Sequence, residues 1–329
     1  MNPQPRRVTI REVAIDAGLS ISTVSRALSG ARAVTPELAD RVRETADRLG
    51  YRVDSIGRSL RTQRTNTLGL VIPDITNPFF PALVKAIEHA ARARGLGILI
   101  ADADNDPVVE RAVLRTLIDR RVDAVLISPA DLTSSLEGLS EAAERVPTIQ
   151  IDRVIDERLP FVRIDQATPL ESIVMHLRST GRRQIAFIGQ QSSIATSLER
   201  ERAFAQIVTA AFPGDAPRIL PGRMSAESGR EAAREVFERW PGTDAIVCAN
   251  DLIAFGVLQE LGDEPGRRTV AISGFDDTLI ATALHLTSGR QPVEQLAEVA
   301  VSLAAESGVG ASAEQVSLLS EVIFRRTTE

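Results

Sequence analysis

Hydrophobic and polar positions divide the 329-residue chain into two parts with different periods. Between residues 8 and 51, apolar residues recur every three or four positions, which is typical of amphipathic helices. From residue 67 onward, short continuous apolar runs alternate with longer helical stretches. The pattern therefore predicts a small all-α part followed by a larger α/β part.

Capping signals divide the first part into three short helices. Thr9 begins a capping box with the glutamate three residues later, so it marks the start of the first helix. Ser20 can cap a second helix, and Thr35, which is followed by proline at the first helical position, can cap a third. Gly18 and Gly50 are natural ends for the first and third helices. The tight turn between the first two helices makes them a candidate helix-turn-helix.

The same helices have predicted inward and outward faces. The inward faces are apolar: Ile10, Val13, Ala14 and Ala17 in the first helix, Ile21, Val24 and Leu28 in the second, and Leu38, Val42, Ala46 and Leu49 in the third. The second helix keeps a polar outward face of Ser22, Thr23, Ser25, Arg26 and Ser29. Hydroxyls suit phosphate oxygens and base edges, and an arginine can bind guanine through two hydrogen bonds. A plain three-helix bundle fits the same pattern and stays open at this point.

Charge is distributed unevenly between the two parts. Residues 1–66 carry 12 arginines against 7 acidic residues, a net charge of +5. Residues 67–329 carry −11, and the whole chain carries −6. A basic head on an acidic body suggests that the head meets a polyanion and the body does not. A merely charged helical surface would give the same count, so charge alone does not decide.

In the second part, seven strand-length apolar runs predict parallel sheets covered by helices on both faces. The runs lie at 68–74, 96–104, 123–130, 146–152, 183–190, 244–251 and 269–277, with helical stretches that include 78–94, 107–121, 196–211 and 226–239. Ligands in such folds bind beyond the carboxyl ends of the strands. Polar residues gather at those ends: Asp74, Asp102, Ser128, Asp152, Arg153, Gln190, Asn250, Asp251, Asp276 and Asp277. Any one of them could simply cap a loop, but together they predict hydrogen-bonding groups delivered to one edge.

Composition and missing motifs exclude several classes of protein. The single cysteine, Cys248, excludes a disulfide framework and CxxC sites, and its apolar neighbours suggest a buried residue rather than a nucleophile. No apolar run approaches the roughly 20 residues of a membrane span, and the N-terminus has no apolar export signal, so we expect a cytoplasmic protein without membrane contact. The only lysine, Lys85, lies outside a Walker A motif, and GxGxxG, GxSxG and HExxH are absent. The three histidines are far apart in sequence. We therefore expect neither an enzyme nor a metal site.

Motifs in the first part resemble a known family. The string VTIREVAIDAGLSISTVSRALSG, followed by VTPELADRVRETADRLGYR, is similar to the DNA-binding head of the LacI/GalR family of bacterial transcriptional regulators. The resemblance implies that the TVSR helix lies in the major groove. It implies base contacts from Ile21, Ser22 and Arg26, and mainly phosphate contacts from Thr23 and Ser25. The remaining DNA-contacting residues expected in the head are Thr9, Ser20 and Ser29.

Residues 52–66 allow two interpretations. As bare sequence they are a flexible basic tether. The resemblance instead implies a hinge helix that folds when a dimer closes on its operator and wedges a leucine into the minor groove. The hinge residues expected at DNA are Ser55 as the cap, Leu60 as the wedge, and Arg58 and Arg61. Gly57 replaces the usual alanine, which costs about 0.5–1 kcal/mol in a helix and predicts a hinge that is harder to order.

The second part matches the same family in sequence order. The matching strings are VIPDITNPFF, ISPAD, IDR, IAFIG, CANDLIAFG, SGFDD followed by TSGRQPVEQLAEVA, and LLSEVIFRRTT. The resemblance implies a periplasmic-binding-protein-like body of two doubly wound parallel-sheet subdomains, joined by three crossing strands, with an effector in the cleft. The implied limits are a helix-turn-helix head at 1–53, a hinge at 54–66 and a body at 67–329. Within the body, about 67–163 with 292–318 form one subdomain, and 164–291 with 319–329 form the other.

The resemblance also implies effector-binding residues, namely Asp74, Phe79, Phe80, Ser128, Asp152, Arg153, Arg200, Met224, Asn250 and Asp276. Carboxylates and arginines suit vicinal hydroxyls, and aromatic faces suit a sugar ring or a purine. Two positions depart from the family pattern. Gln166 replaces a common asparagine, and Met224 replaces an aromatic residue found in some members. These departures predict a smaller or less planar ligand than usual, or none.

The expected function follows from both sites. A homodimer would place two TVSR helices in successive major grooves of a pseudo-palindromic DNA operator. A small sugar-type effector would then release this repressor of a carbohydrate-use operon, with no cofactor required. Two alternatives remain: a regulator of the same fold that responds to a purine or another small molecule, and a solute-binding protein. The second would need an export signal and leaves the head unexplained.

Overall fold

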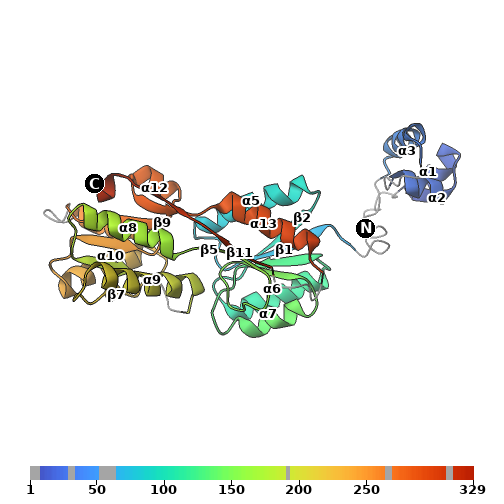
Figure 1. The fold of residues 1–329 in the computed structure, drawn as a ribbon. Coiled ribbons are helices and arrows are strands. Elements are labelled where there is room, and N and C mark those ends of the chain that lie inside the picture. The colour runs from blue at the N-terminus through green and yellow to red at the C-terminus, as the bar shows by residue number, and fades with distance from the viewer. Residues whose placement is uncertain (1–7, 29–33, 52–63, 190–192, 264–268, 309–313) are drawn as a thin grey trace, which may run out of the picture. The chain divides into compact units, whose positions relative to one another are not determined.

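The computed structural model describes residues 8–28, 34–51, 64–189, 193–263, 269–308 and 314–329 (Figure 1). The chain divides into two compact units, Met1–Thr65 and Asn66–Glu329, which we call the head and the body. In the described part of the chain, no helix is long and apolar enough to cross a membrane.

The head contains three helices, α1 (Ile10–Ala17), α2 (Ile21–Leu28) and α3 (Pro36–Leu49). The predicted caps are confirmed. Thr9 forms a complete capping box, the Ser20 hydroxyl accepts from the backbone N–H of Thr23 at 3.1 Å, and Thr35 caps α3. Gly18 and Gly50 end α1 and α3 with φ of 64° and 69°, in the left-handed region that favours glycine.

The core of the head is small and is built from one stripe of each helix. Val13, Val24 and Val42 are fully buried at its centre. The predicted inward position of Ile21 is wrong, because its side chain is 43% exposed. Ile21 is the first residue of α2. Whether a neighbouring helix covers that end of α2 cannot be predicted from apolar periodicity. Ala27, near the other end of α2, is buried and belongs to the core.

The body contains two six-stranded sheets. The first has the strand order β11-β5-β4-β3-β1-β2, and the second has β12-β10-β9-β8-β6-β7. The strands of the first sheet are β1 (Thr67–Ile72), β2 (Gly97–Asp102), β3 (Ala124–Ile127), β4 (Thr148–Asp152), β5 (Phe161–Ile164) and β11 (Gln315–Leu318). Those of the second are β6 (Ile185–Ile188), β7 (Arg218–Leu220), β8 (Ala245–Cys248), β9 (Ala271–Asp276), β10 (Thr287–Arg290) and β12 (Glu321–Ile323). Neighbouring strands are parallel except β10 and β12.

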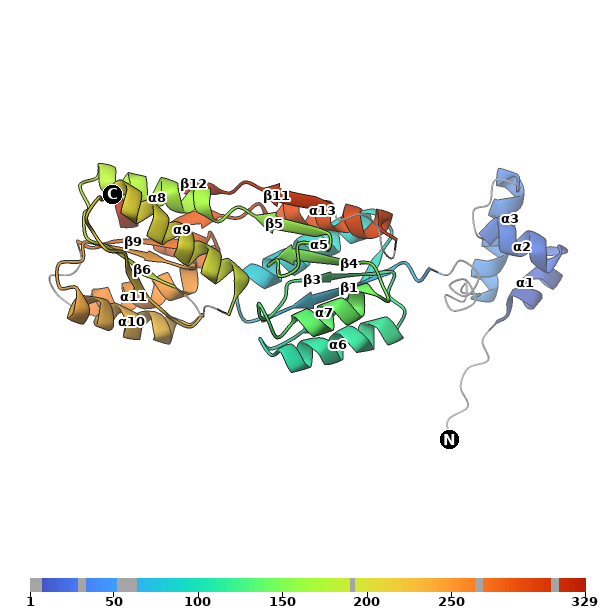
Figure 2. The same cartoon turned by 60° about the horizontal axis from the view of Figure 1, so that its bottom comes forward.

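Helices cover both faces of the first sheet, as its continuous apolar strands predict (Figure 2). One face is covered by α5 (Phe79–Ala93) and α13 (Val293–Glu306), the other by α6 (Pro107–Asp119) and α7 (Leu136–Ala143). Alternate residues of β1 serve the two faces: Leu70 packs with the first pair of helices and Val71 with the second. The first sheet and these four helices form the first subdomain.

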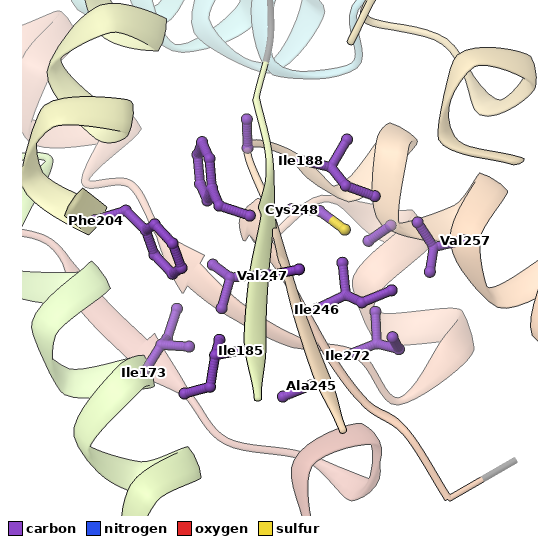
Figure 3. Close-up of a cluster of buried hydrophobic side chains, with 14 of the residues drawn as sticks. Ile173, Ile185, Ile188, Phe204, Ala245, Ile246, Val247, Cys248, Val257 and Ile272 are labelled. Atoms are coloured by element: carbon purple, nitrogen blue, oxygen red, sulfur yellow. The ribbon is translucent and has the colours of Figure 1, made fainter. Parts of the chain in front are cut away.

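The second subdomain repeats this layered arrangement. Helices α8 (Ala167–Ser179) and α9 (Ala195–Ala211) lie on one face of its sheet, and α10 (Ala226–Arg239) and α11 (Asp251–Asp263) lie on the other (Figure 2). The short helices α12 (Leu279–Leu284) and η1 (Arg326–Thr328) complete it. Its core surrounds β6 and β8 and includes Cys248 (Figure 3). Burial raises the pKa of the Cys248 thiol, which agrees with the expected buried role.

The contact between α10 and α11 depends on two glycines. A Cβ added to Gly256 would lie 1.9 Å from the carbonyl oxygen of Ala226, and one added to Gly229 would lie 2.3 Å from that of Ile253. Because backbone atoms stand at both points, only glycine lets the two helices approach this closely.

The chain passes between the subdomains at residues 164–167, 290–293 and 318–321. The expectation that seven strands deliver polar groups to one edge is therefore wrong. Four of those strands belong to the first sheet and three to the second, so the polar ends belong to two sheet edges. The apolar runs carry no signal of which sheet each strand joins.

Candidate effector pocket and nucleic-acid interface

The surface of α2 carries five of the predicted DNA-contacting side chains of the head. Ile21, Ser22 and Arg26 are exposed, whereas Thr23 and Ser25 are half-buried. The Arg26 Nε donates to the backbone carbonyl of Ser22 at 3.2 Å, so the guanidinium lies along its own helix. Of the predicted base-contacting residues, all three are therefore accessible from solvent.

The hydroxyls at the helix starts have structural roles as well. The Ser20 hydroxyl lies 2.8 Å from the hydroxyls of both Ser22 and Thr23. The Thr9 hydroxyl donates to the Glu12 carboxylate at 3.0 Å within the capping box. The other predicted DNA contacts lie outside the described residues: Ser29, Ser55, Arg58, Leu60 and Arg61, together with the departure at Gly57.

A pocket in the body lies between the two subdomains. It is lined by Asn77, Phe79, Phe80, Asp152, Arg153, Thr196, Arg200, Met224, Asp276 and Gln291. The first five of these residues come from the first subdomain, the next four from the second, and Gln291 from the crossing at 290–293. The carboxyl ends of β4 and β9 deliver the two aspartates, as expected for a ligand site in parallel sheets.

Asp152 and Arg153 form the side of the pocket that belongs to the first subdomain. They are 6% and 2% exposed, and the Arg153 Nε lies 4.0 Å from Asp152 Oδ2. The Arg153 Nη1 donates to the Pro129 carbonyl at 3.2 Å, and its guanidinium lies 5.6 Å from the centre of the Phe80 ring. The Nε itself has no hydrogen-bond partner among the described residues. A buried donor left unpaired is costly, so this N–H is suited to a ligand.

Arg200 and Asp276 form the side that belongs to the second subdomain. The Arg200 Nη2 lies 3.6 Å from Asp276 Oδ1, and the guanidinium lies 3.9 Å from the centre of the Phe275 ring. Gln291 donates its Nε2 to Asp276 Oδ1. The Gln291 Oε1 is buried and has no donor within the part of the chain that the structure describes. Two side chains that line the pocket therefore carry an unpaired acceptor and an unpaired donor.

Burial shifts the pKa values of the charged groups in the pocket. Desolvation raises the pKa of Asp152 to about 6, although the nearby Arg153 and Arg200 oppose the shift. Desolvation also raises the pKa of Asp276, and it lowers the pKa of the Arg153 guanidinium. Two arginines and two aspartates thus balance one another in formal charge.

Both pocket aspartates have unusual backbone conformations. Asp152 has φ of 63° and Asp276 has φ of 98°, in the region that residues with a Cβ rarely adopt. Strain of this kind persists where the surrounding structure enforces it, and it concentrates at binding sites. These conformations occur at the last residue of β4 and of β9, where both aspartates line the pocket.

Seven of the ten expected effector residues line this pocket: Phe79, Phe80, Asp152, Arg153, Arg200, Met224 and Asp276. Asp74, Ser128 and Asn250 do not. Asp74 accepts from the backbone and side chain of Thr76, and Ser128 donates to Asp152 Oδ2 at 3.4 Å.

Asn250 caps the start of α11 by accepting from the N–H of Ile253 at 2.9 Å, and its buried Nδ2 is unpaired in the described chain. Asp74, Ser128 and Asn250 therefore make hydrogen bonds beside the pocket and do not line it. A polar residue at a strand end can hold a turn as readily as it can bind a ligand.

Three lining residues were not predicted, namely Asn77, Thr196 and Gln291. Each lies near the start of a helix rather than at the end of a predicted strand. One feature of the sequence could have predicted them: each is a polar residue at or just before the start of a helix, in the strings NPFF, ATS and RQPVEQ.

Two family profiles match the chain. One, described as periplasmic binding proteins and sugar binding domain of LacI family, matches residues 65–306. The other, described as bacterial regulatory proteins of the lacI family, matches residues 9–54. Together they match most of the head and most of the body.

Curated relatives are similar along nearly the whole chain. The transcriptional regulator DegA of Bacillus subtilis is 30% identical, with 98% of each chain covered. Catabolite control protein A of Priestia megaterium is 29% identical, with 90% of this chain and 91% of that protein covered. The ribose operon repressor of Halalkalibacterium halodurans is 28% identical, with 90% and 88% covered.

Solved structures share the fold. A lac repressor dimer bound to operator and an anti-inducer has a TM-score of 0.86 at 21% identity, with 98% of this chain and 99% of that chain covered. A complex of the regulator CelR with cellobiose has a TM-score of 0.72 at 26% identity, with 98% and 100% covered. From the matched profiles and the named relatives, the chain belongs to the LacI family of bacterial regulatory proteins and is a DNA-binding transcriptional regulator, not an enzyme.

Proposed function

We propose that this regulator is a cytoplasmic repressor that binds its operator as a homodimer and is released by a neutral, sugar-type effector. The polar atoms of the residues that line the pocket are the main support for this class of effector. Arg153 offers an unpaired N–H and Gln291 an unpaired carbonyl oxygen, both in buried side chains. A hydroxyl accepts and donates at the same atom, so a ligand with several hydroxyls satisfies both groups.

The charge balance of the pocket favours a neutral ligand. Arg153 and Arg200 face Asp152 and Asp276, and the four side chains are 6% exposed or less. A phosphorylated or otherwise anionic ligand would add unbalanced charge to a buried site, which is costly. Vicinal hydroxyls can instead donate to the carboxylates and accept from the guanidinium groups.

The aromatic residues favour a sugar over a purine. Phe80 is 1% exposed and packs edge-to-face against Phe79, and the Arg153 guanidinium already lies over its ring. Little aromatic surface is left for stacking a planar base.

In this proposal, residues 1–53 bind DNA, residues 54–66 form the hinge, and residues 67–329 bind the effector and form the dimer. Ile21, Ser22 and Arg26 read bases, and Thr23 and Ser25 hold phosphates. An effector that contacts both subdomains shifts their relative angle, because it binds one arrangement better than the other. One cross-cleft contact that such a shift would alter is the hydrogen bond from Leu132 N–H to the Ser193 carbonyl, 2.8 Å long.

Isothermal titration of the full-length protein tests the effector class. D-ribose, D-glucose, D-galactose and cellobiose are compared with hypoxanthine and guanine. Binding of a sugar that is lost in Asp276→Asn supports the proposal. Binding of a purine alone, or sugar binding that Asp276→Asn leaves unchanged, contradicts it. The exposed Asp215→Asn serves as the matched control and retains wild-type binding.

A further inference from the structure

Gln166 lies where the chain passes from the first subdomain to the second. It follows β5 and precedes α8, and it is only 3% exposed. Its Nε2 donates to the carbonyl oxygen of Ile164, the last residue of β5, at 2.8 Å. The Gln166 side chain is therefore attached to one of the three strands that join the subdomains.

The other end of the same amide contacts an effector-pocket arginine. Gln166 Oε1 accepts from the Nε of Arg200, which belongs to α9, at 2.7 Å. The bond joins two buried groups, since Arg200 is 4% exposed. Hydrogen bonds to charged groups are among the stronger ones in proteins, and burial shields this one from water.

This bond decides which N–H groups of Arg200 remain for the pocket. The Nε is used by Gln166, and Nη1 donates to the carbonyl of Ala249. With those two nitrogens held, the planar guanidinium has a fixed orientation, and its Nη2 lies toward Asp276 in the pocket. Arg153 differs, because its Nε has no partner among the residues described.

We propose that Gln166 is a positioning residue that fixes Arg200 for the effector and ties it to the β5 crossing. This inference rests on the proposed function for its ligand but not for the Gln166–Arg200 geometry. Asparagine at this position is one methylene shorter, so it cannot hold the Ile164 carbonyl and the Arg200 Nε together in this backbone. The two contacts together therefore require a side chain of the length of glutamine.

Proton–nitrogen correlation spectra of the arginine Nε–H groups test the geometry on the full-length protein without ligand. Arg200→Lys assigns the Arg200 signal by its loss. In Gln166→Ala and Gln166→Asn, we expect that signal to shift and its solvent exchange to quicken about tenfold. Gln166→Glu keeps an acceptor for Arg200 and loses the donor to the Ile164 carbonyl, so a signal that stays protected separates the Arg200 contact from the β5 contact.

The Arg153 Nε–H is the internal control and should not move in any of these variants. An Arg200 signal unchanged in both Gln166→Ala and Gln166→Asn overturns the proposal. Equal shifts at Arg153 and Arg200 also overturn it, because they indicate a general loosening of the cleft. Gln166→Asn keeps the test available where Gln166→Ala fails to fold.

Titration with D-ribose, D-galactose and cellobiose tests the consequence for binding. A sugar that binds the wild type should bind Gln166→Ala about tenfold more weakly, while operator affinity without sugar stays within about twofold. Unchanged sugar affinity overturns the positioning role. If none of these sugars binds the wild type while the Arg200 signal responds to Gln166, the sugar class fails and the positioning of Arg200 stands.

Discussion

Effector affinity should depend on pH through Asp152. Burial raises the pKa of this carboxyl from the ordinary 3.8 to about 6, against the opposing influence of Arg153 and Arg200. A hydroxyl of the effector donates more strongly to an ionised carboxylate than to a protonated one. With a pKa of about 6, roughly one Asp152 in eleven is ionised at pH 5 and nearly all are at pH 8. Affinity should therefore fall about tenfold, or about 1.4 kcal/mol, from pH 8 to pH 5.

Loss of folding cannot explain this effect. A carboxyl whose pKa is raised in the folded state binds its proton more tightly there than in the unfolded chain. Its contribution to stability is fully present below the unfolded pKa and is lost as the pH rises through about 6. Lowering the pH therefore increases the stability contributed by Asp152 while it decreases effector affinity. The two effects have opposite signs and can be separated by measurement.

The assay is isothermal titration of the effector at pH 5, 6, 7 and 8, with unfolding followed in parallel. Asp152→Asn should bind more weakly at pH 8 and should lose most of the pH dependence. A residual slope is expected from Asp276, whose pKa burial also raises. A wild-type affinity that is flat between pH 8 and pH 5, or a full tenfold change retained in Asp152→Asn, would refute the reasoning.

Three further predictions test the head, the pocket and the packing of the body. Arg26→Ala should reduce the preference for operator over random DNA by roughly 5- to 150-fold per half-site in binding assays, because a bidentate base contact contributes about 1–3 kcal/mol. Asp276→Asn should leave operator binding intact and remove the effector response, measured on the same DNA with and without effector. Gly256→Ala should lower the free energy of unfolding by about 3 kcal/mol in urea titrations, because its Cβ would meet the backbone of α10.

Matched variants decide whether these effects are specific. Arg43 is exposed on α3 and pairs with Asp40, so Arg43→Ala should leave operator preference unchanged. Gly242 has no atom within 4 Å of an added Cβ, so Gly242→Ala should be close to neutral. Loss of both operator binding and effector response in Asp276→Asn would indicate misfolding. Equal destabilisation by the two glycine variants would contradict the close helix contact.

Local signals in the sequence predict much of the fold. The caps at Thr9 and Thr35 and the ends at Gly18 and Gly50 depend on residues within four positions, so pattern reasoning finds them. The apolar strands are equally visible because both faces of each sheet are buried. Apolar runs do not reveal three other strands because polar residues interrupt them: β5 reads FVRI, β7 reads RIL and β10 reads TSGR.

The pocket was predicted less completely for a different reason. Asp152 and Asp276 stand at strand ends in sequence, and the fold brings them to one cleft. Gln291 belongs to a crossing segment, and its place in the pocket depends on how the two sheets face each other. Ile21 shows the same limit in the head, because its exposure depends on the reach of neighbouring helices. Exposure and pocket membership that depend on how distant elements pack together cannot be predicted from local periodicity.

Fluorescence anisotropy tests the central claim most directly. The full-length protein is titrated onto duplex DNA from the gene's own upstream region, at fixed salt because affinity for DNA falls steeply with salt. The titration is repeated with a panel of sugars and purines and with random DNA as the control. The account predicts preference for the upstream DNA and a shift of that curve by one sugar, with random DNA unaffected. Equal affinity for both DNAs would contradict operator recognition, and a shift by purines alone would contradict the sugar-type effector.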